Sequence, residues 1–244
     1  MRIAIVQLRP VKGDIEKNLE NHIIWIKQAL KQKADMVVFP ELSLTGYEPE
    51  LAAELATSQE DKRLDVLQNI SDKNNIIIGA GLPTREGDNL FVSMILFRPG
   101  QRRTTYSKQY LYPTEESVFT PGKNPLVLEY GSDIIAPAIC YELSNPGHHK
   151  FAISHHANIY LASVMNSVSG VDADIQQLSE LAKAHHMVTF MANYVGISAG
   201  YECAGKSSVW NEKGELIAQL GTKEEGIILF DSVNRETLKF ISQS

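Results

Sequence analysis

Short apolar runs alternate with amphipathic stretches through the first half of the chain. Residues 2–8 are rich in strand-forming side chains, and the run at 36–40 is continuously apolar, which is typical of a strand buried on both faces. Between these two runs, apolar side chains recur every three or four residues, at Ile15, Leu19, Ile23, Ile26 and Leu30. This spacing predicts an amphipathic helix. A second helical stretch is expected over 50–70, followed by strands at 75–83 and 89–97.

The second half repeats this alternation. Helices are expected over 145–156 and 171–186, the latter with Leu178, Leu181 and Ala182 on its inner face. The remaining apolar runs predict strands at 125–130, 133–140, 158–164, 188–196, 206–210, 215–220 and 226–231.

The number of expected strands sets the architecture. About eleven strands and four helices are more than one sheet usually holds. Two sheets packed face to face, with helices on their outer faces, would bury both the sheets and the apolar sides of the helices. No internal repeat or Pro-, Gly- or Ser-rich linker divides the chain, so we expect a single α/β domain over residues 1–244.

Composition narrows the classes of partner. The 244 residues are 43% hydrophobic and carry a net charge of −6, with no basic stripe of the kind that nucleic acid requires. No apolar run approaches the roughly 20 residues that span a bilayer, and the apolar start is too short for a signal peptide. The two cysteines are far apart and form no CxxC pair, which predicts a reducing, cytoplasmic setting without disulfides.

Three polar residues stand near the ends of apolar runs. Glu41 follows the run at 36–40, Lys108 lies among aromatic residues, and Cys140 ends the run at 133–140. Taken singly, each has an ordinary explanation: a loop or capping acid, a surface lysine and a small buried hydrophobe.

Taken together, these three side chains suit nucleophilic catalysis. A free thiol has a pKa of about 8.5, so it needs a base to become a thiolate at neutral pH. Attack on a carbonyl also needs positive charge or N–H groups where the oxyanion develops. An acid, a thiol and an ammonium group would meet both needs if the strand ends meet.

The motifs around these residues resemble a known family. FPELSLTGY (39–47), YSKQYL (106–111) with FTPG (119–122) after it, and AICYE (138–142) occur in this order, and the likeness extends to 203–217. They are similar to the nitrilase or carbon-nitrogen hydrolase superfamily. The resemblance implies a four-layer αββα sandwich of two mixed sheets, assembled as a homodimer or a larger homo-oligomer.

The resemblance also implies roles for individual residues. Glu41 would be the general base, Cys140 the nucleophile, and Lys108 the ammonium group that stabilises the oxyanion. A second active-site glutamate precedes FTPG in many members, which selects Glu115, with Glu116 as the alternative. The N–H of Tyr141 would be a second oxyanion donor.

Residues after the nucleophile bear on specificity. Nitrile-cleaving members usually carry tryptophan after the cysteine, so the tyrosine at this position favours an amide or an N-carbamoyl substrate. Glu142 is interpreted as a structural acid that bonds backbone or a nearby cation. The strand at 158–164 ends near the site in relatives, which makes Ser163, Val164 and Met165 candidate substrate contacts.

These expectations define one leading function and two alternatives. The leading hypothesis is a cysteine-dependent hydrolase of a small amide (amidase, ω-amidase or N-carbamoyl amide hydrolase type), which needs no cofactor or metal. The alternatives are a glutaminase-like subunit that supplies ammonia to a separate partner, and a catalytically idle scaffold. Six of the seven histidines form doublets, but no HExxH motif accompanies them, so surface or interface positions are expected rather than zinc ligation.

Overall fold

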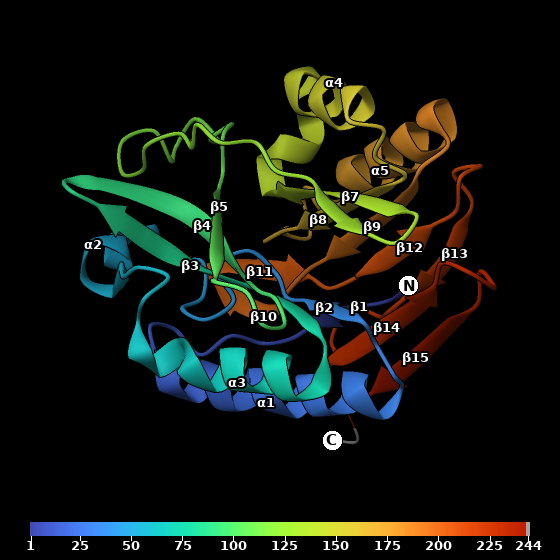
Figure 1. The fold of residues 1–244 in the computed structure, drawn as a ribbon. Coiled ribbons are helices and arrows are strands. Elements are labelled where there is room, and N and C mark those ends of the chain that lie inside the picture. Colours follow the sequence, from blue (N-terminus) through green and yellow to red (C-terminus); the bar gives the residue numbers. More distant parts are fainter. Residues whose placement is uncertain (243–244) are drawn as a thin grey trace.

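The computed structural model describes residues 1–242, which form two β-sheets between two layers of helices (Figure 1). The seven-stranded sheet has the strand order β15-β14-β1-β2-β3-β4-β5. Its strands are β1 (Arg2–Gln7), β2 (Met36–Val38), β3 (Ile77–Glu86), β4 (Asn89–Phe97), β5 (Thr104–Ser107), β14 (Gly226–Asp231) and β15 (Thr237–Ile241). The central strands β1, β2 and β3 are parallel, and the outer neighbours pair antiparallel, so the sheet is mixed.

The six-stranded sheet is built on the same plan. Its order is β13-β12-β9-β8-β7-β6, with parallel β7, β8 and β9 at its centre. Its strands are β6 (Leu128–Tyr130), β7 (Asp133–Ile139), β8 (Ile159–Ser163), β9 (Val188–Ala192), β12 (Ser208–Trp210) and β13 (Leu216–Gln219). A small separate hairpin consists of β10 (Val195–Ser198) and β11 (Tyr201–Ala204).

Helices cover the outer face of each sheet. In Figure 1, α1 (Ile15–Lys31) and α3 (Asp65–Asn74) lie below the seven-stranded sheet, and α4 (Pro146–Ser154) and α5 (Val171–His185) lie above the six-stranded sheet. The α1 helix begins where the Asp14 side chain accepts a hydrogen bond from the Lys17 N–H at 2.9 Å, as an N-cap does. The shorter helices are α2 (Ala52–Leu55), η1 (Pro49–Leu51), η2 (Lys62–Leu64) and η3 (Cys140–Ser144).

Three apolar clusters fill the three spaces between the four layers. The first lies between α1, α3 and the seven-stranded sheet and contains Trp25 and Ile26. The second lies between the two sheets and contains Ile5 and Phe190. In the third, Leu178, Leu181 and Ala182 pack α5 onto the six-stranded sheet, as the sequence predicts. The four-layer αββα sandwich of mixed sheets is therefore confirmed.

The structure differs from the sequence-based expectation in some elements. The stretch at 50–70 is not one helix, because α2 ends at Leu55 and a loop precedes η2 and α3. Residues 1–242 form fifteen strands rather than eleven: the expected strand at 188–196 is divided into β9 and β10, and β5, β11 and β15 were not predicted as strands. These strands have only four or five residues each and carry several polar side chains, which leaves a weak periodic signal.

Candidate active site

Glu41 lies in a turn that follows β2 and is held against β3. Leu42 has a left-handed backbone with φ +51°, and Gly81 of β3 faces it. A Cβ on Gly81 would lie 2.4 Å from the Leu42 nitrogen, so only glycine permits this close approach. The carbonyl of Gly81 accepts a hydrogen bond from Leu44 at 2.9 Å, and the Tyr194 hydroxyl donates to the Glu41 carbonyl at 2.6 Å. These contacts fix the backbone that carries the Glu41 carboxylate, whose residue is only 2% exposed.

Lys108 follows β5 and is held on both sides by backbone hydrogen bonds. Its N–H donates to Val92 of β4, and its carbonyl accepts from Gly122, each at 2.8 Å. The buried ammonium group donates to Glu41 Oε1 and to Glu115 Oε1, again at 2.8 Å each. Lysine is almost never fully buried without a partner of opposite charge, so Lys108 and the two carboxylates form a charged cluster.

Glu115 completes this cluster from the segment between Lys108 and Gly122. Its Oε1 also accepts from the Tyr47 hydroxyl at 2.8 Å, and its Oε2 accepts from the Tyr112 N–H at 2.7 Å. Glu115 is 1% exposed, whereas Glu116 is exposed to solvent. Of the two neighbouring glutamates, Glu115 is therefore the one that the fold brings to Lys108.

Cys140 lies at the junction of β7 and η3. Its φ of +47° is the left-handed conformation, which is costly for a residue with a side chain and which occurs at functional sites where the surroundings enforce it. The thiol donates to the carbonyl of Met165, with 3.9 Å between the sulfur and the oxygen. The N–H of Met165 in turn donates to Glu41 Oε2 at 3.3 Å. Met165, which lies two residues after the end of β8, therefore contacts both the Cys140 thiol and Glu41.

Burial and neighbouring charges decide the protonation of this site. Burial raises the pKa of the Cys140 thiol, the carboxylates of Glu41 and Glu115 raise it further, and only Lys108 lowers it. Burial also raises the pKa of Glu41 beyond what Lys108 offsets. Burial lowers the pKa of Lys108, but the charges around it outweigh this effect, and the pKa is raised overall. The resting site therefore holds a neutral thiol beside an ammonium group that stays charged.

Glu142, two residues after Cys140, forms a second buried cluster. One of its oxygens accepts from the Gln109 N–H at 2.6 Å, and the other accepts from the Ile139 N–H at 2.7 Å and the Tyr106 hydroxyl at 2.8 Å. Burial raises the pKa of Glu142 to about 7, although these hydrogen bonds lower it. The carboxylate thus ties the residue after Lys108 to the residue before Cys140, which is the structural role expected for it.

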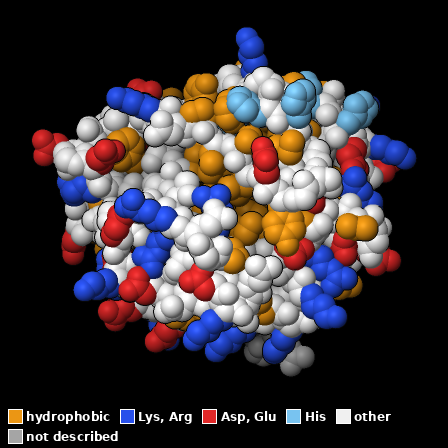
Figure 2. Space-filling view, viewed as in Figure 1, with side chains coloured by type: hydrophobic (Ala, Val, Ile, Leu, Met, Phe, Trp, Pro, Cys, Tyr) orange, Lys and Arg blue, Asp and Glu red, His pale blue; other side chains and the backbone are white. Residues whose placement is uncertain are grey.

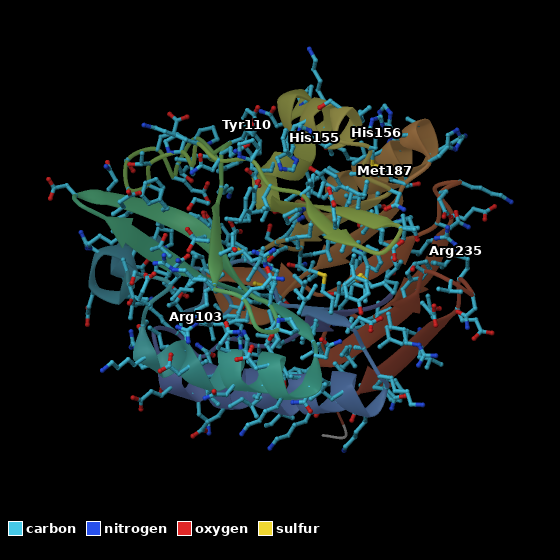
Figure 3. All side chains as sticks on the ribbon, viewed as in Figure 1. Arg103, Tyr110, His155, His156, Met187 and Arg235 are labelled. Atoms are coloured by element: carbon cyan, nitrogen blue, oxygen red, sulfur yellow. The ribbon has the colours of Figure 1, made fainter. Side chains whose placement is uncertain are left out.

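A histidine extends this second cluster. His148 Nε2 lies 3.0 Å from the Tyr106 hydroxyl, and its Nδ1 lies 2.8 Å from the Tyr160 hydroxyl. Tyr110, labelled in Figure 3, packs edge-on against the imidazole with ring centroids 6.4 Å apart. Burial lowers the pKa of His148 to about 4, so the ring is neutral at physiological pH. His148 belongs to a histidine doublet that was expected at the surface or an interface, and this expectation is wrong for it, because the ring is only 2% exposed and bonds two buried tyrosines. Tyr47 and Tyr106 were not singled out from the sequence, where an aromatic residue carries no signal of its partners.

The four residues suggested as substrate contacts or oxyanion donors lie in different surroundings. Ser163 is buried and donates to the carbonyl of Phe39 at 2.7 Å, and Val164 packs in the cluster beneath α5. Met165 is partly buried and contacts the thiol through its backbone, as described above. Tyr141 is 37% exposed and packs edge-on against Tyr112, with ring centroids 5.3 Å apart.

The histidine doublets have structural contacts of their own. On the face of the molecule drawn in Figure 2, histidine side chains gather over α4 and the end of α5. His155 and His156, labelled in Figure 3, lie at the C-terminal end of α4, and His155 Nδ1 is 2.9 Å from the Phe151 carbonyl. His186 ends α5 with a left-handed backbone. Among residues 1–242, no three His, Cys, Asp or Glu side chains lie close enough together to hold a metal ion.

Comparison with known proteins identifies the class. The profile of the carbon-nitrogen hydrolase family matches residues 2–240. A solved structure of an amidase from Nesterenkonia sp. AN1 superposes with a TM-score of 0.86 at 26% identity, over 95% of this chain and 92% of that one. A cysteine-to-alanine mutant of that amidase has been solved in complex with butyramide.

Two curated relatives are similar over most of this chain. A nitrilase from Pyrococcus abyssi is 27% identical, over 93% of this chain and 87% of its own length. A glutamine-dependent NAD(+) synthetase from Thermotoga maritima is also 27% identical, over 98% of this chain. The chain spans only 43% of the length of that synthetase.

The chain belongs to the carbon-nitrogen hydrolase family. The solved relatives include an amidase, and in one mutant of it acrylamide has added to the active-site cysteine. Among residues 1–242, every helix is too short or too polar to span a bilayer.

Proposed function

We propose that this protein hydrolyses the C–N bond of a small, non-peptide amide through a thioester on Cys140. The observation that carries the proposal is the buried cluster in which Lys108 donates to both Glu41 and Glu115 beside the Cys140 thiol. A solved relative, the Nesterenkonia amidase, binds butyramide when its cysteine is replaced by alanine, which supports a short aliphatic amide.

The proposed reaction begins with transfer of the thiol proton. Glu41 takes the proton from Cys140, and the thiolate adds to the amide carbonyl. Because burial raises the pKa of the thiol, the proton stays on Cys140 until the substrate arrives. Lys108 and the Tyr141 N–H then hold the tetrahedral oxyanion.

The second half of the reaction releases the acid. Glu41 protonates the leaving ammonia or amine, which leaves an acyl thioester on the sulfur. Water activated by Glu41 hydrolyses the thioester and frees a carboxylic acid and the thiol. In this scheme Glu115 keeps Lys108 charged and oriented, so it is a positioning residue that is expected to touch the substrate as well.

Intact-mass spectrometry of acid-quenched protein tests the proposal directly. Protein incubated with small amides should gain the mass of the acyl group on the peptide that contains Cys140, and ammonia should appear in parallel. Cys203 serves as an internal control, because this buried thiol should stay unmodified, and burial raises its pKa to about 11. A Cys140→Ala variant that releases ammonia at the wild-type rate would overturn the scheme.

A second candidate function is supported by the synthetase relatives. Their similarity covers nearly all of this chain but less than half of their own, as expected for a part that supplies ammonia from glutamine to a second part. Glutamine hydrolysis that is slow alone and rises on addition of a cell extract would favour this function. Fast hydrolysis of simple aliphatic amides by the isolated chain would favour the amidase.

A further inference from the structure

Asn193 is a buried amide that the proposed chemistry does not use. It directly follows β9 and is 0% exposed. Its Oδ1 accepts a hydrogen bond from the Asn166 N–H at 2.8 Å. Its Nδ2 donates to the carbonyl of Asn166 at 3.2 Å and to that of Gly205 at 2.8 Å. The side-chain oxygen thus has a donor and the NH2 group has two acceptors, which is what a buried amide requires.

The Asn193 side chain lies where two paired strands separate. Strands β8 and β9 run parallel, and just beyond β8 the Val164 N–H still donates to the carbonyl of the last residue of β9, at 2.9 Å. The chain after β9 then crosses to the seven-stranded sheet, where Tyr194 forms an isolated parallel bridge with Leu8. The next N–H that would face β9 is that of Asn166, and it loses its backbone partner there. Asn193 Oδ1 replaces that partner, so the side chain extends the pairing of β8.

One peptide group connects this hydrogen bond to the candidate active site. The Asn166 N–H and the Met165 carbonyl belong to the same planar trans peptide group, in which they point in opposite directions. The bond to Asn193 Oδ1 therefore fixes the direction of the carbonyl that accepts from the Cys140 thiol. The neighbouring Met165 N–H donates to Glu41 Oε2 at 3.3 Å. Rotation of this peptide group would disturb both the thiol and its proposed base.

Further hydrogen bonds hold Asn193 itself in place. Its backbone N–H donates to the Ser207 hydroxyl at 2.9 Å, and the Ser207 N–H donates to Gln7 Oε1 at 2.9 Å. Gln7 is the last residue of β1 and is also 0% exposed, so these bonds connect the two sheets. A buried network in which each member has its partners is rigid, and Asn193 can therefore impose one orientation on the peptide group that it binds.

We propose that Asn193 is a positioning residue, which holds the Met165 carbonyl toward the Cys140 thiol and the Met165 N–H toward Glu41. Its side chain is enclosed by the backbone that it binds, so it acts through this peptide group and not on the substrate. Its contribution is to orient the thiol for transfer of the proton to Glu41. This inference rests on the proposed function, because that transfer is the first step of the proposed reaction.

The informative variant is Asn193→Ala, which removes the three hydrogen bonds of the side chain. Its kcat for a short amide such as butyramide should fall by about 10²-fold, because a misplacement of about 1 Å at reacting groups has this effect, and KM should stay within about threefold. Asn193→Asp keeps an oxygen that accepts from the Asn166 N–H, so it should retain a kcat about tenfold above that of Asn193→Ala. Ammonia release measures these changes, and circular dichroism checks the fold.

The matched control is Asn158→Ala, at the other end of β8. Asn158 directly precedes this strand, and its side chain also binds backbone of a neighbouring segment. Its Oδ1 accepts from the Ile134 N–H at 2.8 Å, and its Nδ2 donates to the Ser132 carbonyl at 3.2 Å. Loss of this amide should leave kcat within about threefold of wild type. Equal losses of kcat in the two alanine variants would show a general loosening of β8 and would overturn the proposal.

Alkylation of the thiol separates positioning from stability and does not depend on turnover. Iodoacetamide forms a bond from its methylene carbon to the Cys140 sulfur and loses iodide, while the thiol proton passes to the base. Intact-mass spectrometry follows the gain in mass. If Asn193 orients the thiol toward Glu41, Asn193→Ala should slow this alkylation by about tenfold. A looser fold would expose the thiol, so an alkylation that is unchanged or faster would contradict the proposal.

The two measurements together distinguish failure of this inference from failure of the proposed function. If wild-type protein hydrolyses butyramide and Asn193→Ala keeps its kcat, the proposed function stands and Asn193 does not position the thiol. If wild-type protein hydrolyses no small amide but Asn193→Ala is alkylated more slowly, Asn193 positions the thiol and the proposed reaction is wrong.

Discussion

Two buried polar clusters adjoin Cys140, and they balance charge in different ways. In the first, Glu41 and Glu115 share the ammonium group of Lys108, so the charges are compensated by ion pairs. In the second, Glu142 is held by two backbone N–H groups and the Tyr106 hydroxyl. The first arrangement keeps a cation near the nucleophile, whereas the second joins segments of backbone. The Lys108 cluster is therefore suited to take part in the reaction, whereas the Glu142 cluster holds the backbone that positions Lys108 and Cys140.

The largest expected effect comes from removing the shared cation. Lys108→Met should lower kcat/KM by about 10³-fold or more, because it removes an oxyanion donor and leaves two carboxylates facing each other. Steady-state ammonia release measures the loss, and circular dichroism checks the fold. Lys123→Met, at an exposed position further along the same segment, is the control and should retain activity. A folded Lys108→Met protein with wild-type kcat would remove Lys108 from the chemistry.

Disrupting the second cluster should affect stability and activity together. Glu142→Ala leaves the N–H groups of Gln109 and Ile139 without their acceptor, which should cost about 2–4 kcal/mol of unfolding free energy. Because both residues adjoin the proposed catalytic groups, kcat should also fall, by about 10²-fold. Urea unfolding and ammonia release measure the two losses, with Glu116→Ala as the exposed control. Loss of stability with unchanged kcat would show that the two clusters are independent.

A smaller change probes the edge of the first cluster. Tyr47→Phe removes the hydroxyl that donates to Glu115 Oε1 at 2.8 Å. A hydrogen bond to a charged group contributes about 1.5 kcal/mol, so kcat/KM should fall by about tenfold. Most of the loss should appear in kcat if Glu115 positions Lys108, and in KM if Glu115 mainly holds the substrate. An unchanged kcat/KM would show that Lys108 alone orients Glu115.

The last expected effect is a change in the pH dependence of stability and not a loss of activity. Burial raises the pKa of Glu142 to about 7 in the folded protein, above the ordinary 4.5. Between these values the folded state holds a proton that the unfolded state releases, so this group lowers stability as pH rises. Glu142→Gln removes the effect, and its stability relative to wild type should rise with pH across this window, by at most about 1.4 kcal/mol per pH unit. A difference that is constant with pH would show that Glu142 is ionised throughout.

The sequence predicts the fold better than it predicts the contacts of the site. The four-layer sandwich follows from long, strongly periodic segments such as α1 and α5, and from the buried parallel strands. Short elements such as β5 escape prediction because four residues, of which three are Thr or Ser, show no clear alternation. Between α2 and α3 the sequence still shows a helical pattern of apolar residues. The helix nevertheless ends there, because the backbone of Ala56 is extended, with ψ 132°.

For the candidate site, too, the sequence predicts some residues and misses others. Glu41, Lys108 and Cys140 could be selected because together they suit nucleophilic catalysis and because their motifs resemble those of the carbon-nitrogen hydrolases. The phenol of Tyr47 could not. In the sequence Tyr47 is one more aromatic residue, and only the tertiary structure brings its hydroxyl to Glu115.

Met165 illustrates how a protein can separate reactivity from selectivity at one position. Its contacts with Cys140 and Glu41 are made by its carbonyl and its N–H, which every residue except proline possesses. The side chain at 165 can therefore be exchanged without removing those atoms. In a library of variants at position 165, every non-proline member would keep the backbone carbonyl and N–H that contact Cys140 and Glu41. Such a library would offer a starting point for directed evolution toward amides of another shape.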